Sequence, residues 1–301
     1  MKRFACTCMA LLLLAAGCQT LDTVTDLGTS IGVATGTITT DQAQSIGRTT
    51  KAVAKTFEDI TPEQEYYIGR AVAATILDTY KLYRNDAATR YLNTLGQALA
   101  MASEKPETFG GYHFAIMDTE EVNAFAAPGG LIMVSRGLLR CCRSEDAVAA
   151  VLAHEIGHIE KLHGLKAIKQ GRLRSALTIV AVEAGKNLGG EQLAEVTAAF
   201  EGSITDITDT LVNGGYARSQ EREADQSAVA IMRRVGYNPM GLVDMLQQMD
   251  RLMKPDDKGF GKTHPDPADR VADLKALVRG SGPIQRPAAR EARFKAAMRG
   301  V

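Results

Sequence analysis

The feature that most constrains this chain is an H-E-x-x-H sequence at residues 154–158, inside a segment with helical periodicity from Ser144 to His163. A spacing of four residues turns a helix by about 400°, so His154 and His158 leave one face of the helix one turn apart. Two ligands of a tetrahedral zinc ion need this arrangement. Glu155 points to an adjacent face, from which it can reach a water molecule on the metal without being a ligand. The alternative is a pair of histidines on an ordinary amphipathic helix.

A catalytic zinc ion needs a third protein ligand and an open position for water. Glu221 and Glu223 are the candidates, and periodicity distinguishes them. Glu221 shares an apolar stripe with Ala224 and Ala228, whereas Glu223 lies about 200° away on the solvent side. A carboxylate on a buried face needs a partner charge, which a zinc ion supplies, although a surface salt bridge remains the alternative for Glu221. Asp225, one turn beyond Glu221, can accept the outer N–H of a ligand histidine.

The rest of the chain has helical patterns on both sides of a short extended region. Runs separated by turn residues predict strands at His113–Met117, Val122–Ala126 and Leu131–Val134. Periodicity predicts helices at Tyr66–Tyr83, Ala87–Ala102, Ser144–His163, 172–184, 191–212, 217–235 and 239–253, and a last short helix from Asp266-Pro267. A Thr61–Gln64 capping box is expected to start the first helix. The fold class is therefore α+β, a mainly helical domain with a small three- or four-stranded sheet.

The amino-terminal residues predict export and lipid attachment. Lys2 and Arg3 precede the apolar run Phe4–Ala16, and small residues then lead to Cys18. This pattern resembles a bacterial lipoprotein signal, in which Cys18 is lipidated and becomes the mature amino terminus. Gln19 favours the outer membrane, by resemblance to lipoprotein sorting rules. A plain signal peptide and an amino-terminal anchor helix are the alternatives, and no internal apolar run approaches the roughly 20 residues of a membrane span.

Composition narrows the function further. With 35 Lys and Arg against 35 Asp and Glu, the chain lacks the positive charge that nucleic-acid binding needs. Cys6 and Cys8 would leave with the signal and Cys18 would carry the lipid, so a framework of several disulfides is excluded. Cys141 and Cys142 are adjacent and would pair only through a strained ring. We therefore expect buried thiols rather than a redox switch.

The H-E-x-x-H sequence and the R-x-x-E-x-E-A-D sequence at residues 218–225 together resemble the CAAX-prenyl-protease/HtpX-like family of zinc metalloendopeptidases, in particular its soluble periplasmic BepA-type branch. The similarity extends to residues 122–130 and to Thr263-His264-Pro265, so it covers about residues 61–278. Two departures are Ala217, where the family often has serine, and the lack of a tetratricopeptide array after the protease domain. The second departure leaves the recruitment of substrates open.

The resemblance implies a gluzincin-type zincin fold and assigns roles to single residues. His154, His158 and Glu221 would be the ligands of one zinc ion per chain, and Glu155 would be the general base and acid. Together with the amino-terminal signal and the composition of the chain, it predicts four parts, which are a lipoprotein signal peptide at 1–17, a lipidated tether at 18–60, a zinc metalloprotease domain at 61–280 and a carboxy-terminal tail at 281–301.

Further residues are candidates for transition-state stabilisation, which needs a donor besides the metal. Arg218, three residues before Glu221, is one of them. His264 is the other, because its Thr-His-Pro segment resembles a family segment close to the metal. It would donate to the transition state or act as a fourth ligand that holds the site closed, and a plain loop histidine is the alternative. His163 is interpreted as a partner of the helix dipole rather than a ligand.

Residues 131–134 are a candidate edge strand against which an extended substrate pairs. Gly129 and Gly130 would allow close backbone approach, and Leu131, Ile132 and Met133 would follow them along the substrate. Core packing of these side chains is the equally good alternative.

The leading hypothesis is a lipid-anchored periplasmic zinc metalloendopeptidase, held at the outer membrane of a Gram-negative bacterium without a transmembrane helix in the mature protein. Its substrates and partners would be unfolded, misfolded or misassembled envelope proteins, and no nucleic acid. The alternative is a chaperone or assembly factor whose zinc site is latched and which cleaves little.

Overall fold

The computed structural model describes residues 60–168, 201–252, 264 and 267–301. The predicted signal peptide, most of the tether and the predicted helix at 172–184 lie outside these residues. The described elements are α3 (Pro62–Thr79), α4 (Asp86–Ala100), β1 (His113–Met117), β2 (Ala124–Ala127), η1 (Pro128–Gly130), β3 (Leu131–Ser135), α5 (Arg136–Cys141), α6 (Glu145–Glu160), α7 (His163–Lys166), η2 (Thr210–Gly214), α10 (Arg218–Val235), α11 (Met240–Leu252), α13 (Pro267–Leu277) and α14 (Ala288–Ala297). This mainly helical arrangement with a small sheet confirms the predicted α+β class.

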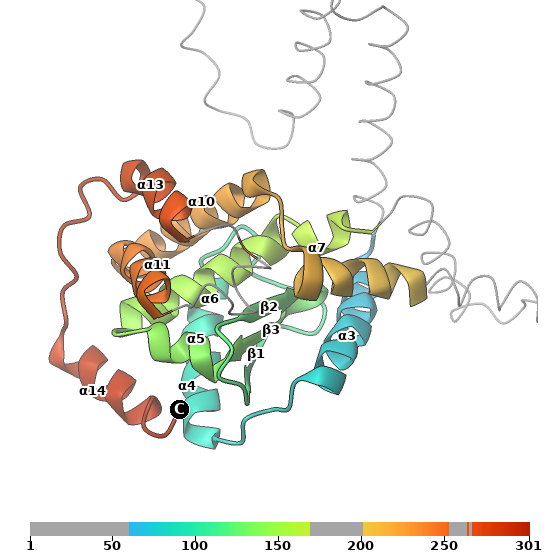
Figure 1. Cartoon of the computed structure of the whole chain (residues 1–301), viewed down its shortest axis with the longest axis horizontal. Coiled ribbons are helices and arrows are strands. Elements are labelled where there is room, and N and C mark those ends of the chain that lie inside the picture. Colours follow the sequence, from blue (N-terminus) through green and yellow to red (C-terminus); the bar gives the residue numbers. More distant parts are fainter. Residues whose placement is uncertain (1–59, 169–200, 253–263, 265–266) are drawn as a thin grey trace, which may run out of the picture. The chain divides into compact units, whose positions relative to one another are not determined.

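Helix α6 forms the centre of the domain. Every residue from Glu145 to Ile159 is buried, because α10, α11, α4 and strand β2 all pack against it. Figure 1 shows α10 and α13 on one side of α6 and the sheet on the other. A helix that is covered all round gains its stability from tertiary packing rather than from an amphipathic face. Its start is fixed locally, since the Ser144 hydroxyl accepts a hydrogen bond from the Ala147 N–H at 3.2 Å.

The sheet has three strands in the order β1-β3-β2. Strand β3 pairs in parallel with β1, from His113↔Leu131 to Met117↔Ser135, and antiparallel with β2. β3 is therefore the central strand, and both of its edges are occupied by hydrogen bonds to neighbours. The outer edge of β1 is partly covered as well, because Leu82 forms a bridge with Met117.

Helix α3 begins as the sequence predicts but ends earlier. Thr61 and Gln64 form both hydrogen bonds of the capping box, at 3.2 and 2.8 Å. The prediction of helix as far as Tyr83 is wrong, because the helix stops at Thr79. The next residues run extended beside β1, where the Tyr83 N–H donates to the Ile116 carbonyl at 2.8 Å. Pairing with the sheet thus overrides the local helical pattern.

The carboxy-terminal residues are not a plain tail, because they form helix α14 and pack on the domain. Arg293 of α14 donates to the carboxylate of Glu145 at the start of α6, with an Nε–Oε2 distance of 2.5 Å. Phe294 and Val301 pack against the hydrophobic core. The residues of α14 favour a helix, but a helix of 10 residues is marginal by itself in water, so its stability depends on these tertiary contacts.

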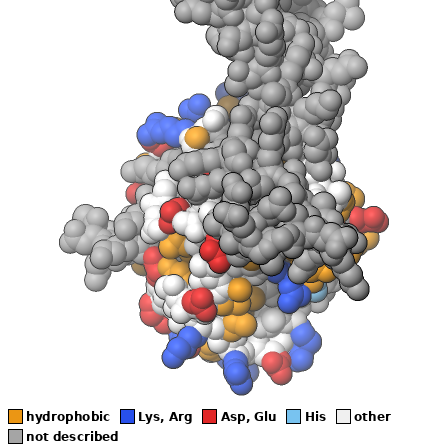
Figure 2. Space-filling view, turned by 90° about the vertical axis from the view of Figure 1, so that its right-hand side faces the viewer, with side chains coloured by type: hydrophobic (Ala, Val, Ile, Leu, Met, Phe, Trp, Pro, Cys, Tyr) orange, Lys and Arg blue, Asp and Glu red, His pale blue; other side chains and the backbone are white. Residues whose placement is uncertain are grey.

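The described surface carries charges of both signs, and Figure 2 shows Lys and Arg side chains interspersed with Asp and Glu on one face. Among the described helices, none combines the length and the apolar character that crossing a membrane requires. Cys141 and Cys142 are free and buried, which confirms the expectation of buried thiols.

Candidate metal centre

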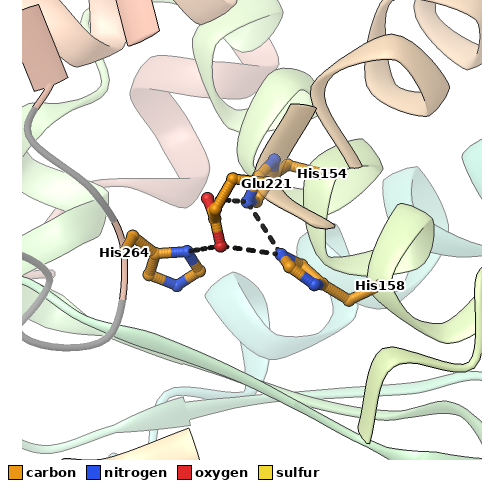
Figure 3. A group of neighbouring side chains, drawn as sticks. All are labelled: His154, His158, Glu221 and His264. Atoms are coloured by element: carbon orange, nitrogen blue, oxygen red, sulfur yellow. Dashed lines mark hydrogen bonds and ion pairs between the residues drawn. The ribbon is translucent and has the colours of Figure 1, made fainter. Parts of the chain in front are cut away.

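Four side chains from three parts of the chain meet in the interior of the domain (Figure 3). His154 and His158 come from α6, Glu221 from the first turn of α10, and His264 from the residues before α13. One possible ligand atom of each lies within 4.8 Å of all the others. All four residues are buried, with at most 4% of any residue exposed. The structure thus brings together the three predicted ligands and the predicted fourth candidate.

The inward-facing atoms define the centre of this group. The Nε2 atoms of His154 and His158 lie 3.1 Å apart, as their spacing on one helix face requires. Glu221 Oε1 lies 3.4 Å from His158 Nε2, and its Oε2 lies 3.5 Å from His154 Nε2. His264 Nδ1 lies 2.7 Å from Glu221 Oε1. Imidazole nitrogens and a carboxylate that converge in this way form a donor set for a transition-metal ion.

Gly157 sets how closely the two helices approach. A Cβ atom at this position would lie 2.9 Å from the Ala224 carbonyl oxygen and 3.0 Å from Ser227 Cβ, both on α10. The absence of a side chain lets α10 approach α6 directly at the metal-ligand turn. Glu221 stands on the same buried side of α10 as Ala224 and Ala228, as its predicted stripe requires.

The charges of the group favour a bound cation. Burial by itself would raise the pKa of Glu221, but His264 and Arg270 hold it well below its ordinary value. Glu221 is therefore a buried carboxylate, and its Oε2 accepts no hydrogen bond from the described part of the chain. Such an atom normally has a polar partner or a metal ion. The residues present therefore fit a metal ion.

The two histidines of α6 have opposite protonation tendencies in the absence of a metal. Burial and Arg270 act against protonation of His154, yet the nearby carboxylates of Asp225 and Glu221 raise its pKa to about 9. Burial dominates at His158 and holds its pKa well below the ordinary value. The cause of the difference lies in the groups that contact the outer face of each ring.

The outer face of His154 contacts an ion pair. His154 Nδ1 lies 2.9 Å from Asp225 Oδ1, which agrees with the predicted position of Asp225. Arg270 of α13 binds the same carboxylate through Nη2–Oδ1 and Nε–Oδ2 contacts of 2.6 and 3.1 Å. Its Nη1 also lies 3.4 Å from Glu221 Oε2. Sequence reasoning missed Arg270, although it shares the buried side of α13 with Leu274, the same signal that identified Glu221.

The outer face of His158 contacts uncharged rings. Tyr216 stacks on His158 with ring centroids 4.1 Å apart and an angle of 17°. His158 Nδ1 lies 2.9 Å from His163 Nδ1, and His163 Nε2 lies 3.1 Å from Glu223 Oε2. Helix α6 ends at Glu160, so the interpretation of His163 as a dipole partner at its end is wrong. Glu223 lies on the exposed side of α10, as predicted.

Glu155 is buried beside the four residues, and burial raises the pKa of its carboxyl. Arg218 lies elsewhere, because its side chain is 68% exposed and donates to Asp269 at 2.7 Å. Arg218 is the first residue of α10 and follows the exposed face of the helix rather than the face of Glu221. The structure does not support a part for Arg218 in the chemistry, and Arg270 is the arginine near the ligands.

The predicted substrate strand is also placed differently. Leu131, Ile132 and Met133 belong to β3, which is central in the sheet and has no free edge for a substrate. Gly129 and Gly130 have positive φ angles of 77° and 101° and form the turn between β2 and β3. The expectation that β3 is an edge strand is wrong, and the alternative of core packing holds for its largely buried side chains.

Comparison with known proteins agrees with this geometry. Residues 86–278 match the model of peptidase family M48. The chain belongs to peptidase family M48. This membership confirms the resemblance that the H-E-x-x-H sequence and the following acidic motif indicate.

Several relatives of this chain have names that refer to proteolysis. The chain is 27% identical over 260 residues to the beta-barrel assembly-enhancing protease of Yersinia pestis. This match covers 84% of this chain and 47% of the Yersinia pestis protein. It is 25% identical over 170 residues to the metalloprotease LoiP of Escherichia coli, covering 56% of this chain and 64% of LoiP. It is 29% identical over 159 residues to the mitochondrial metalloendopeptidase OMA1 of Schizosaccharomyces pombe, covering 51% of this chain and 42% of OMA1. The chain thus spans about half the length of the assembly-enhancing proteases that it matches.

Proposed function

We propose that this protein is a zinc-dependent metalloendopeptidase that hydrolyses peptide bonds of misfolded or misassembled cell-envelope proteins. The observation that carries the proposal is the buried convergence of His154, His158 and Glu221 in an M48 chain, with the carboxyl group of Glu155 next to them. Nitrogen and carboxylate donors of this kind suit zinc. A purely structural site would have no use for an additional buried carboxyl group.

The proposed roles follow from these positions. His154, His158 and Glu221 would hold one zinc ion, which when bound supplies a Lewis acid that polarises the scissile carbonyl and activates water. Glu155 would take the proton of the attacking water and return it to the leaving amine. The raised pKa of Glu155 suits both transfers, because a base of higher pKa accepts a proton more readily and then serves as the acid. Arg270 would hold Asp225 and Glu221 in place.

Strand β2 is the better candidate for pairing with substrate. It is an outer strand of the described sheet and packs against α6, which carries His154 and His158. An extended peptide that adds to an outer strand gains main-chain hydrogen bonds without any particular sequence. This mode of binding suits a protease whose substrates are unfolded chains.

The test is the Glu155→Gln variant, which keeps the size of the side chain and removes its proton-accepting charge. We expect zinc content to stay near one ion per chain, while cleavage of an unfolded outer-membrane protein falls by at least about 10²-fold. Glu63→Gln, at an exposed position in the first turn of α3, is the matched control and should cleave at the wild-type rate. Full activity of Glu155→Gln would refute the protease proposal.

His264 favours a second candidate function. Its contact with Glu221 and its place among the four converging residues suit a fourth ligand, and a protein with a closed site would act as a chaperone or assembly factor. The same position suits donation to the transition state. A His264→Ala variant that cleaves faster than wild type would identify a latch, and one that cleaves more slowly would identify a transition-state donor.

We also propose the compartment and the domain layout. The resemblance of the first residues to a lipoprotein signal supports removal of residues 1–17, lipidation of Cys18, a tether to residue 60 and a periplasmic domain anchored to the outer membrane. The name of the Yersinia pestis relative, which refers to assembly of beta-barrels, supports envelope proteins as substrates. Incorporation of labelled palmitate should be lost in Cys18→Ala and kept in Cys6→Ala. Palmitate labelling of Cys18→Ala equal to that of the wild type would exclude Cys18 as the lipid anchor.

A further inference from the structure

His163 is a buried imidazole that the proposed chemistry does not use. None of its surface is exposed, and a buried polar ring needs a partner for each nitrogen. Both partners are present. His163 Nδ1 lies 2.9 Å from Nδ1 of His158, and His163 Nε2 lies 3.1 Å from a carboxylate oxygen of Glu223 on α10. The three side chains form a continuous row from a proposed ligand to the surface, where 49% of the Glu223 side chain is exposed.

The row has one arrangement of protons that leaves His158 able to bind a metal. A carboxylate oxygen only accepts hydrogen bonds, so the Nε2–H of His163 donates to Glu223. Nδ1 of the neutral His163 ring is then an acceptor, and it receives the Nδ1–H of His158. His158 consequently carries no proton on Nε2, which is the atom that faces His154 and Glu221. Glu223 therefore sets the tautomer of His158 through two successive hydrogen bonds, with His163 between them.

The residue before His163 has a strained backbone conformation. Leu162, between α6 and α7, has a φ of 57° and is the one residue other than glycine with a positive φ in the described part of the chain. This conformation is unfavourable for a branched side chain. It joins α6 to α7, and His163, five residues after His158, then meets the ring of His158 edge-on, with ring centroids 5.0 Å apart.

We propose that His163, anchored by Glu223, is a positioning residue that fixes the tautomer and the ring orientation of the metal ligand His158. The inference rests on the proposed metal site, in which His158 binds zinc through Nε2. Tyr216 contributes the stacking contact on the same ring, and its hydroxyl forms no hydrogen bond within the described part of the chain. Outer partners of ligand histidines commonly contribute a factor of about 10–100 in metal affinity.

The experiment measures zinc affinity by competition with a chromogenic chelator and records the visible spectrum of the cobalt-substituted protein. We expect His163→Leu to weaken zinc binding by about 10–100-fold and to change the cobalt spectrum. His163→Gln, which retains an acceptor and a donor, should recover part of the affinity. His113→Leu is the matched control, because this exposed strand histidine bonds only to the Gly110 carbonyl among the contacts that the structure gives it.

Glu223 provides a test that does not disturb the core. Glu223→Ala removes the anchor of His163 and should weaken zinc binding several-fold, whereas Glu223→Gln keeps an acceptor and should recover part of the affinity. Thermal unfolding of the metal-free variants separates a positioning role from a purely structural role. If His163 and Glu223 were purely structural, their variants would unfold at a lower temperature but bind zinc with unchanged affinity. If Glu223→Ala and folded His163→Leu both bound zinc with the affinity of the wild type, the positioning role of His163 would be refuted, and the proposed function would stand. If the wild-type protein itself bound no zinc, the proposed function would fail as well.

Discussion

Helix α6 has buried acidic groups near both of its ends, and the two ends use them differently. At the amino end, Glu145 accepts hydrogen bonds from Arg293, from the Tyr237 hydroxyl at 2.7 Å and from the Tyr91 hydroxyl at 3.3 Å. Its neighbour Asp146 accepts from the Asn238 N–H at 2.8 Å. Each carboxylate is thus stabilised by donors of the protein itself, with the helix dipole in its favour.

At the carboxyl end the donors of the protein do not suffice. Glu221 has Arg270 beside it, but the guanidinium is bound in bidentate fashion to Asp225. His264 Nδ1 reaches Oε1 of Glu221, but Oε2 accepts no hydrogen bond from the described part of the chain, and the inward nitrogens of His154 and His158 face Glu221 and each other. Ligand atoms that converge in this way need a cation between them, which is a proton on His154 in the absence of metal and the metal ion when it is bound.

The comparison shows how a buried charge cluster that stabilises the fold differs from one that binds a metal. Burial and proximity of charged groups are common to both ends of α6. The difference is whether donors and acceptors are matched within the protein. Donors and acceptors are matched at the amino end, so the structure there should tolerate removal of the metal. The structure at the carboxyl end should depend on the bound metal.

Exchange of one carboxylate at each end gives the largest expected contrast. Glu221→Gln should weaken zinc binding by about 10³-fold, since each ligand supplies a share of the roughly 10–16 kcal/mol of a complete zinc site. Proteolysis should be lost with the metal. Glu145→Gln should leave zinc content and cleavage unchanged in the folded protein. Equal zinc loss in both variants, measured by mass spectrometry of the metal after dialysis, would show that the two ends are coupled.

Removal of the arginine at the amino end should lower the stability of the fold and leave zinc affinity unchanged. Arg293→Leu leaves the Glu145 carboxylate buried without its cation, which costs roughly 3–5 kcal/mol when a fully buried pair is broken. Half of the Arg293 side chain is exposed, so solvent screening reduces the expected loss of stability to about 2 kcal/mol. Urea unfolding of the metal-free protein measures this loss. A change in zinc affinity instead of stability would contradict the assignment of this end to the fold.

The same contrast explains which parts of the site the sequence predicts. His154, His158 and Glu221 are fixed by spacing on two helices, and helix geometry turns spacing directly into position. Asp225 follows from the same periodicity. Periodicity can place Arg270 on the buried side of α13, but which groups that side faces, and where His163 lies, depend on how α13 and α7 pack against α6 and α10, and single-helix periodicity does not give that packing. Patterns within one element therefore located the ligands, and contacts between elements located their supports.

The fold divides in the same way. The strands and most helices follow local patterns, whereas the sheet order does not, so β3 between residues 131 and 135 was expected at an edge and lies at the centre. Helix α14 depends on the ion pair between Arg293 and Glu145, which joins residues 148 positions apart. The apolar content of its sequence is too low to predict that docking.

The smallest expected effect concerns the thiols that precede α6. Burial raises the pKa of Cys141 to about 11 and that of Cys142 well above its ordinary value. A raised pKa keeps the thiol protonated, so at pH 8 only about a thousandth of Cys141 is the reactive thiolate, and the fraction rises about tenfold per pH unit towards pH 11. We expect iodoacetamide to label the peptide with both cysteines slowly in the native protein and rapidly in urea. Because the amino end of α6 does not depend on metal, a chelator should leave the native labelling rate unchanged. Faster labelling after chelation would mean that loss of metal loosens the whole length of α6, and the two ends would then form one cooperative unit.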